Sequence, residues 1–490
     1  MNLSTRDWAM TAASTKALRR GRRLLVAMSG PRVMPTLVAL LAAGLALSAL
    51  SQADTPPAVK SALVASTLVL AAGLALSVRV LITSGDAFAS RVFPLAYTCA
   101  CLLGPAIYAA TGGFGPYFLK PSQLTVTSVA ALTIFVASLA AGLWVPVPGR
   151  AKKTSPPHRQ VVGTRLPFAT RQTLFRIALA LLLVAAALRL AHLVMFGPGS
   201  FNTFNGFGAT WQITAFRYAS LLPLPAVMLL LIAVRRPLAT LVPPSALALL
   251  GIWGITSLII GTRDELLAPT IVLLWAYHHR IKRIPIGKLA AVACAGFLAL
   301  AIVGLLRTGT AMNPISAILR PVASATNTST LAVNAIPSQS QHLYGETYLV
   351  AMMHALPVVP IDLDDHPTAT HRFPDVINHT AQSGLGFSPV AEAWWNFGWL
   401  GLVTIPLLFA FMLRMAEMKA HAWPVQATCL AYPLIISRIP VMLRGDFLQQ
   451  YKGILVPLLA VGLVVFVTSW ASYRRSGQTG SRSAKGRSST

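Results

Sequence analysis

The sequence predicts an all-α fold, a polytopic membrane helix bundle with about 12 transmembrane helices. Of the 490 residues, 55% are hydrophobic and only 11% are charged, whereas a soluble chain averages about 25% charged residues. The mean hydropathy is +0.65, and apolar runs long enough to cross a bilayer recur along the chain. Lysine and arginine lie between these runs, as topology determinants do. This placement argues against nucleic acid as a partner, despite the net charge of +27.

Four apolar runs in the N-terminal part predict the first helices, over 33–52, 61–82, 92–111 and 124–147. The first run is long for the apolar core of a signal peptide, so we interpret it as an uncleaved anchor rather than a cleaved leader. The octapeptide Leu-Ala-Ala-Gly-Leu-Ala-Leu-Ser occurs at 41–48 and again at 70–77. Its small residues favour close packing between helices.

Eight further runs complete the bundle. After a basic linker at 148–172, they predict helices over 173–196, 214–234, 238–260, 264–278, 288–306, 397–414, 423–441 and 453–471. One long insertion, 307–396, separates the ninth helix from the tenth. The chain therefore divides into a basic N-terminal segment (1–32), a membrane domain (33–471) and a tail (472–490) whose Ser, Gly and Arg content predicts disorder.

The basic residues predict the orientation of the helices. With the N-terminus in the cytoplasm, 28 of the 40 Lys and Arg residues fall on the inner side, 9 on the outer side and 3 within spans, while 10 of the 13 acids fall outside. Positive charge collects on the cytoplasmic side of membrane proteins. We therefore expect both termini to be cytoplasmic and 307–396 to be an outer loop.

Three consecutive charged residues, Arg263, Asp264 and Glu265, open the eighth predicted helix at its outer end. The apolar run behind them has only 12 residues, about 18 Å of helix, whereas the hydrocarbon layer is about 30 Å thick. Charges that sink to this depth must face protein or water. We expect them to line a cavity open to the outside; a local ion pair that closes a tight turn is the alternative.

Other polar residues lie at the same outer level. Several arginines at one depth suit a phosphate or pyrophosphate, because the guanidinium group binds it with two parallel hydrogen bonds. The i, i+4, i+7 spacing of Glu392, Asn396 and Trp399 predicts one shared helix face. Helix capping, lipid-headgroup contact and an interfacial aromatic belt are the alternatives. These residues are Arg307, Arg438, Arg444, Glu392, Asn396, Trp399 and Asp446.

Some classes of site are disfavoured by the sequence. There is no glycine-rich phosphate loop, which argues against an enzyme driven by a cytosolic nucleotide. The five histidines of the outer loop, His371 among them, have irregular spacing that matches no metal motif. The basic stretch His-His-Arg-Ile-Lys-Arg at 278–283 reads as a plain topology signal.

Four ordered motifs resemble the O-antigen polymerase (Wzy-type) family of oligosaccharide repeat-unit polymerases. They are GTRDELLAPTI (261–271), YGETYLVAMMHALPVVP (344–360), GLGFSPVAEAWWNFGWLG (384–401) and RGDFLQQYKGILVPLL (444–459), so the resemblance covers roughly 250–460. It implies a fold similar to multi-span lipid-sugar glycosyltransferases. Arg263 resembles the arginine of the family's GxR motif, Glu392 the glutamate before NFG, and Arg444 with Asp446 the R-x-D. The RX10G-like loop pattern of some members is not obvious here.

The resemblance implies a glycosyltransferase of the bacterial cytoplasmic membrane that polymerises undecaprenyl-pyrophosphate-linked repeat units at the outer face, for surface polysaccharide biosynthesis. Its partners would be membrane lipid, a flippase and a chain-length regulator. No cofactor is implied, because arginines can supply the charge that a metal would give. We expect Arg263, Arg307, Arg438 and Arg444 to bind pyrophosphate, and Glu265, Asn396 and Trp399 to orient substrate. Glu392, Asp446 and His371 are the candidates for the base, and we favour Glu392, as the base or as the residue that orients the acceptor hydroxyl.

Two other functions remain open at this stage. A ligase would use the same chemistry to move a glycan to a different acceptor. A transporter or flippase of lipid-linked sugar should carry polar groups through the full membrane depth, often with inverted repeats. No inverted repeat is visible, and the in-span arginines are few: Arg176, Arg189 and Arg217. The clustering of charges outside the spans favours the polymerase.

Overall fold

The computed structural model consists mainly of α-helices in the part of the chain that it describes. This part is 56–110, 123–146, 166–198, 220–233, 243–260, 263–280, 282–285, 287–289, 291–292, 295–296, 314–336, 342–355, 367–376, 387–422 and 430–485. Over these residues no strand is present. The all-α class predicted from the sequence is therefore confirmed.

Thirteen helices have defined bounds within the described residues. In chain order they are α3 (Pro57–Ser84), α4 (Phe93–Ala110), α5 (Val126–Trp144), α6 (Phe168–Phe196), α9 (Pro223–Ala233), α10 (Pro244–Ile260), α11 (Arg263–Arg280), α13 (Pro314–Ala335), α14 (Glu346–Ala355), α15 (Ala369–Val376), α16 (Pro389–Ala422), α17 (Ala431–Met442) and α18 (Phe447–Lys485).

Five of these helices are long and apolar enough to cross a membrane by length and composition: α3, α5, α6, α16 and α18. Four shorter apolar helices, α4, α9, α10 and α17, accompany them. The chain is thus a multi-pass membrane protein. The first predicted span, 33–52, and most of the ninth, 288–306, lie outside the described residues. The count of about 12 spans, their orientation and the domain boundaries stay predictions.

Local sequence explains where several helices begin and end. Helix α3 starts on a proline and stops at Gly85, whose φ of 65° is the left-handed conformation typical of a helix C-terminus. Helix α5 begins with a reciprocal capping box between Thr125 and Ser128. Helix α18 continues to Lys485, so residues 472–485 are helical where the composition predicted disorder. No proline or glycine pair interrupts the helix there, and it extends the apolar run that precedes it.

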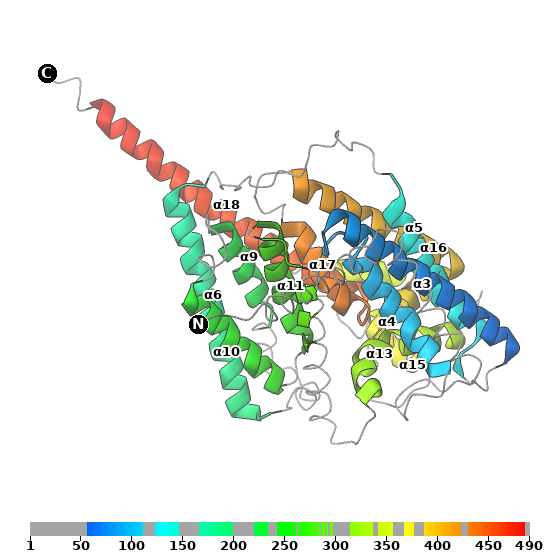
Figure 1. Cartoon of the computed structure of the whole chain (residues 1–490). Coiled ribbons are helices and arrows are strands. Elements are labelled where there is room, and N and C mark those ends of the chain that lie inside the picture. The colour runs from blue at the N-terminus through cyan, green and yellow to red at the C-terminus, as the bar shows by residue number, and fades with distance from the viewer. Residues whose placement is uncertain are drawn as a thin grey trace, which may run out of the picture.

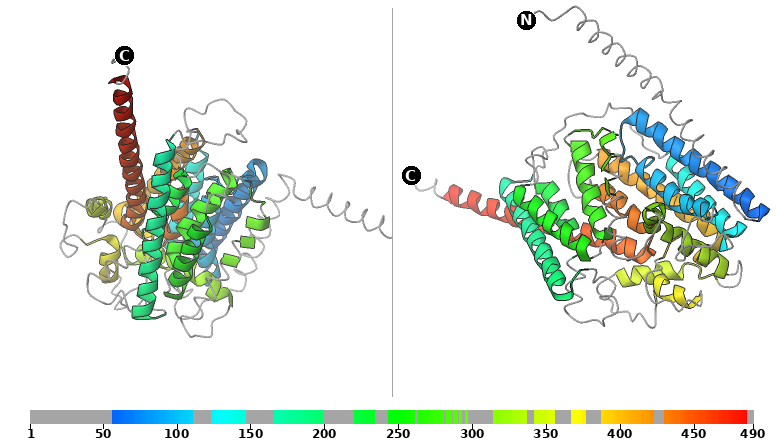
Figure 2. Two further views of the ribbon diagram at one scale, coloured as in Figure 1. Left: turned by 90° about the vertical axis from the view of Figure 1, so that its left-hand side faces the viewer. Right: turned by 60° about the horizontal axis from the view of Figure 1, so that its bottom comes forward.

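The helices form two groups joined by a central pair. Helices α3, α4, α5 and α16 lie together on one side, α6, α9 and α10 on the other, and α11 and α17 between them (Figure 1). Helix α16 packs closely on α5, because Gly142 leaves room for the backbone of Leu407 and the side chain of Ala410. The end of α18 projects beyond the bundle in both views of Figure 2.

Candidate active site

The carboxylate of Glu392, near the start of α16, joins three segments of the chain. Glu392 is 1% exposed. The hydroxyl of Thr347 on α14 donates to its Oε1 at 2.9 Å, and the backbone N–H of Phe447 on α18 donates to its Oε2 at 2.7 Å. Both oxygens of the carboxylate are therefore engaged by segments that lie 45 and 55 residues away.

Asn396, one turn further along α16, extends the same network. Its Nδ2 donates to Thr347 Oγ1 at 2.6 Å and to the backbone oxygen of Glu392 at 2.8 Å. Its Oδ1 accepts the N–H of Gly345 at 3.0 Å, and its backbone oxygen accepts the N–H of Tyr344 at 3.0 Å. The i, i+4 spacing thus correctly predicts that Glu392 and Asn396 share one face, and this face holds the turn before α14.

Trp399 does not continue this face. Gly398, with φ 55° and ψ −137°, breaks the regular helix between Asn396 and Trp399. Trp399 is 43% exposed, whereas Glu392 and Asn396 are buried. The helical spacing that predicted a shared face therefore stops at Gly398, since the i+7 position assumes an unbroken helix.

Two glycines allow the close approach between α16 and the turn before α14. At Gly398 the φ is positive, and an added Cβ would lie 2.9 Å from His342 Nε2. At Gly345 the φ is 96°, and an added Cβ would lie 3.1 Å from the ring of Phe397. Glycine adopts a positive φ without strain and has no Cβ that could collide with a neighbour. The motifs 344–360 and 384–401 therefore each have a glycine where the two segments meet.

Asp446 belongs to the same group. It is 3% exposed, and its Oδ2 accepts a hydrogen bond of 2.7 Å from Thr370 Oγ1 on α15. Its charge also acts on the carboxylate of Glu392, so two acids lie near each other in a buried region. Like charges in such a position repel unless hydrogen bonds compensate them, and the donors from α14, α15 and α18 supply these bonds.

Helix α15 brings His371 to the edge of this group. The ring Nδ1 of His371 lies 2.8 Å from Thr368 Oγ1. The His371 side chain is exposed at the surface of α15. The next residue, Arg372, forms an ion pair of 2.6 Å with Glu346 at the start of α14. Of the three predicted base candidates, His371 is thus the exposed one, while Glu392 and Asp446 are buried.

Aromatic rings seal the network on the side of α14. Tyr348 stacks on Phe397 with ring centroids 6.2 Å apart and meets Phe447 edge-on at 5.2 Å. Burial raises the pKa of the Tyr348 hydroxyl well above its ordinary value, and the nearby carboxylate of Glu392 adds to the rise. Tyr348 therefore remains a neutral phenol at physiological pH.

The predicted phosphate-binding arginines fall in different parts of the fold. Arg444 is half-buried, and its backbone oxygen accepts the N–H of Phe387 at 3.2 Å, just before α16 begins. Arg438 lies on α17 against α18, where a Cβ added to Gly453 would be 2.9 Å from the guanidinium carbon. Arg444 thus lies beside the Glu392 network, and Arg438 lies between α17 and α18.

The charged entry of α11 is only partly described. Arg307 and the side chain of Arg263 lie outside the described residues. Glu265 forms an ion pair with Arg189 of α6, whose side chain is 3% exposed. Arg189 was not among the predicted site residues, and the sequence shows it only as one of a few arginines within spans. Its place inside an apolar span could have indicated a role, because an ionisable residue in such a span marks a functional site by default.

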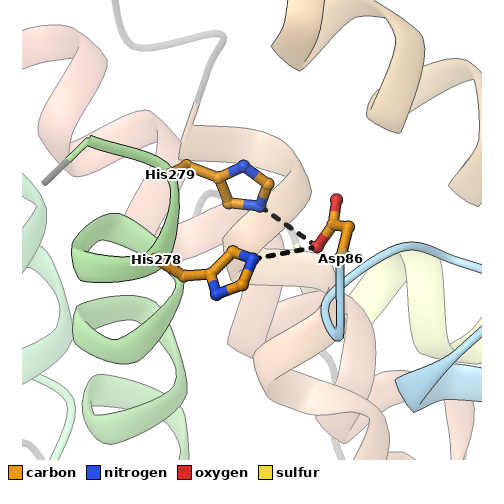
Figure 3. Close-up of side chains that lie close together, drawn as sticks. All are labelled: Asp86, His278 and His279. Atoms are coloured by element: carbon orange, nitrogen blue, oxygen red, sulfur yellow. Dashed lines mark ion pairs between the residues drawn. The ribbon is translucent and has the colours of Figure 1, made fainter. Parts of the chain in front are cut away.

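A separate group of three potential metal ligands lies at the other end of α11 (Figure 3). The Asp86 carboxylate is 3.7 Å from His278 Nε2 and 3.5 Å from His279 Nε2, and the three ligand atoms lie within 4.8 Å of one another. However, His278 Nδ1 accepts the N–H of Ile284 at 3.1 Å. The neutral ring then carries its hydrogen on Nε2, which leaves no lone pair there for a metal. This chemistry favours a polar tie between α11 and the end of α3.

A second buried carboxylate on α16 makes a similar tie. Glu417 accepts the backbone N–H of Ser90 at 3.2 Å and its hydroxyl at 2.7 Å, and forms an ion pair with Arg414. Two of the three acids predicted on the inner side, Asp86 and Glu417, thus bind the segment between α3 and α4 to its neighbours.

Comparison with known proteins gives one match. The family model described as O-antigen polysaccharide polymerase Wzy matches residues 164–474, which is more than half of the chain and includes the whole Glu392 network. No curated protein and no solved structure matches the chain.

Proposed function

Since its match over residues 164–474 shows that the chain belongs to the O-antigen polysaccharide polymerase Wzy family, we propose that it joins undecaprenyl-pyrophosphate-linked oligosaccharide repeat units at the outer face of the bacterial cytoplasmic membrane. Its product would be a surface polysaccharide still attached to the lipid. A flippase would supply the repeat units, and a chain-length regulator would act on the product.

The convergence of three motifs on the Glu392 carboxylate carries this proposal. Segments 344–347 and 444–447 are far apart in the sequence, yet both donate hydrogen bonds to this one side chain. The motifs that resemble the family therefore form one local structure and not three unrelated matches. Such convergence of polar groups from several elements is typical of an active site.

The reaction requires no nucleotide. The acceptor hydroxyl attacks the anomeric carbon of the donor glycan, and the bond between that carbon and the pyrophosphate oxygen breaks. Undecaprenyl pyrophosphate leaves with the electron pair, and the hydroxyl proton passes to a base on the enzyme. Positive groups that meet the leaving pyrophosphate lower the barrier, because negative charge grows there in the transition state.

We assign the leaving-group role to the arginines at the outer level: Arg263, Arg307, Arg438 and Arg444. Arg444 directly precedes the Gly-Asp-Phe stretch that contacts Glu392. Trp399, with its exposed ring, is suited to stack on a sugar, and Asn396 orients the turn at Gly345.

Glu392 is better suited to positioning than to proton transfer. Both of its oxygens already accept hydrogen bonds from the protein, and the side chain is buried. Asp446 has one oxygen engaged by Thr370 and is also buried. We therefore propose His371 as the base, because it is exposed and Thr368 holds its Nδ1, which leaves Nε2 for the acceptor hydroxyl.

The test uses purified protein in nanodiscs with a lipid-linked repeat unit as the only substrate. The wild type should convert single units into a ladder of multiples without nucleotide. His371→Gln should still bind the lipid-linked donor but elongate at least roughly a hundredfold more slowly. Single units that persist with the wild type would contradict the polymerase. Normal elongation by His371→Gln would remove that residue as the base.

The outer-face placement has its own test in cells. A reporter fused after Gln382 should read as external, and one fused after Arg475 should read as cytoplasmic, because 28 of 40 basic residues then face the cytoplasm. A cytoplasmic signal at Gln382 would contradict the placement of the active site.

A further inference from the structure

A cluster of one buried and two partly buried charges lies among α6, α11, α17 and α18. Arg189 of α6 is 2% exposed and forms an ion pair with Glu265 of α11. The charge of Glu265 also acts on Arg438 of α17. The guanidinium of Arg438 in turn lies against the backbone of α18 at Gly453. Helix α17 contacts both α11 and α18, and α18 contacts α6.

The described side chains of this cluster carry an excess of positive charge. Glu265 is ion-paired with the guanidinium group of Arg189, and its charge also acts on the guanidinium group of Arg438. In addition, the Nε atoms of Arg189 and Arg438 are buried, and neither has a hydrogen-bond partner among the residues that the structure describes. A buried cation is costly unless an anion compensates it and its donors are satisfied. The cluster is therefore short of one anion with several acceptor oxygens.

The depth of the cluster fits a ligand that comes from the outer leaflet. Arg189 lies seven residues before the end of α6 and Gly453 six residues after the start of α18, about 10 Å and about 9 Å along the helix axes. The predicted topology puts both of these helix ends at the outer face. Glu265 lies in the first turn of α11, and the predicted topology puts this helix end at the outer face as well.

We infer that Arg189 and Arg438 form a buried binding site for a phosphate group of the lipid-linked donor, and that the Glu265 carboxylate takes the place of that phosphate when no donor is bound. A phosphate offers the same charge and more acceptor oxygens than a carboxylate, so it can satisfy donors that Glu265 leaves unpaired. The inference rests on the proposed function for the identity of the donor and adds Arg189, and an exchangeable counterion, to that site.

The test measures binding of undecaprenyl pyrophosphate, without sugars, to the full-length protein in phosphatidylcholine nanodiscs. Glu265→Gln should bind it about tenfold more tightly, since a competing charge is removed. Arg189→Met should bind it at least about tenfold more weakly. Equal or weaker binding by Glu265→Gln would overturn the exchange, because Glu265 would then support the site and not compete for it.

Replacing a charged residue could prevent folding, so a matched pair of glycine-to-alanine variants on α18 tests the site without a change of charge. Gly453→Ala places a methyl group against the Arg438 guanidinium and should weaken binding about tenfold. Gly462→Ala, where an added Cβ meets nothing within 4 Å, should bind as the wild type does. Identical affinities for the two variants would overturn the assignment of Arg438.

Two further measurements complete the test. The first distinguishes a donor phosphate from a phospholipid headgroup, and the second distinguishes failure of this inference from failure of the proposed function. Loss of undecaprenyl pyrophosphate binding in phosphatidylglycerol nanodiscs would show that a phospholipid headgroup fills the site, which overturns the donor assignment. If the wild type elongates lipid-linked units but the variants show no binding pattern, this inference alone fails. If the binding pattern holds but the wild type does not elongate, the polymerase fails and the phosphate site stands.

Discussion

Replacing Glu392 with glutamine separates a positioning role from a role as the base. The variant keeps the shape of the side chain and removes its charge. A hydrogen bond to a charged group contributes about 1.5–3 kcal/mol and a neutral one about 0.5–1.5 kcal/mol. The bond from the Phe447 amide would therefore weaken by ~1 kcal/mol. The glutamine amino group would then face Thr347, whose hydroxyl already accepts from Asn396 and would lose its own acceptor.

The combined cost should be about 2 kcal/mol for the docking of α14 and α18 on α16. Local opening of these segments would then be about 30-fold more frequent, since each 1.4 kcal/mol is a factor of ten. Hydrogen exchange measured by mass spectrometry should show this as faster exchange in peptides that contain Tyr348 and Phe447. Elongation should fall by about a hundredfold, because a misplacement of about 1 Å at an active site has that effect on rate.

Glu417→Gln is the matched control, because Glu417 is also a buried carboxylate of α16 that accepts one amide and one hydroxyl. It should speed exchange around Ser90 and leave exchange at Tyr348 and the rate of elongation unchanged. The reasoning would be refuted if Glu392→Gln abolished elongation while exchange at Tyr348 and Phe447 stayed at the wild-type rate. Glu392 would then act on the substrate directly, as a base.

Three other substitutions test the remaining parts of the site. Arg263→Lys keeps the charge but loses the two-pronged geometry, so it should strongly shorten the polymer at normal protein levels; wild-type chain length in both Arg263→Ala and Arg444→Ala would refute the pyrophosphate role. Gly398→Ala puts a Cβ at a positive φ and against His342, so it should lower the free energy of unfolding, measured by thermal denaturation, by ~1–3 kcal/mol. Gly251→Ala is its control, because an added Cβ there meets nothing within 4 Å. Asp446→Asn should weaken the hydrogen bond that Thr370 of α15 donates to this side chain, so limited proteolysis near Thr370 should become faster. An unchanged cleavage rate would contradict the proposal that Asp446 holds α15 in place.

Local spacing predicted some of the site correctly. Glu392 and Asn396 are four residues apart, and four residues return to the same face of any regular helix. Their partnership with Thr347 and Gly345 could not be predicted in this way, because those residues belong to another helix and the turn before it. The prediction for Trp399 fails because Gly398 adopts a conformation that only tertiary contacts with the turn at His342 select.

Composition and the order of the motifs were enough to determine the class of protein. Apolar runs of sufficient length must become helices in a bilayer, since no other open structure satisfies the backbone there, and the motifs led to the family that the match over residues 164–474 confirms. For charges that pair between helices, such as Arg189 with Glu265, helix packing decided the partner. Glu265 lies in the first turn of α11 and pairs with Arg189 of α6, 76 residues away, because packing brings these two side chains together. A buried charge binds the opposite charge that packing brings within reach, and when the two lie on different helices their distance in the sequence does not reveal the pairing.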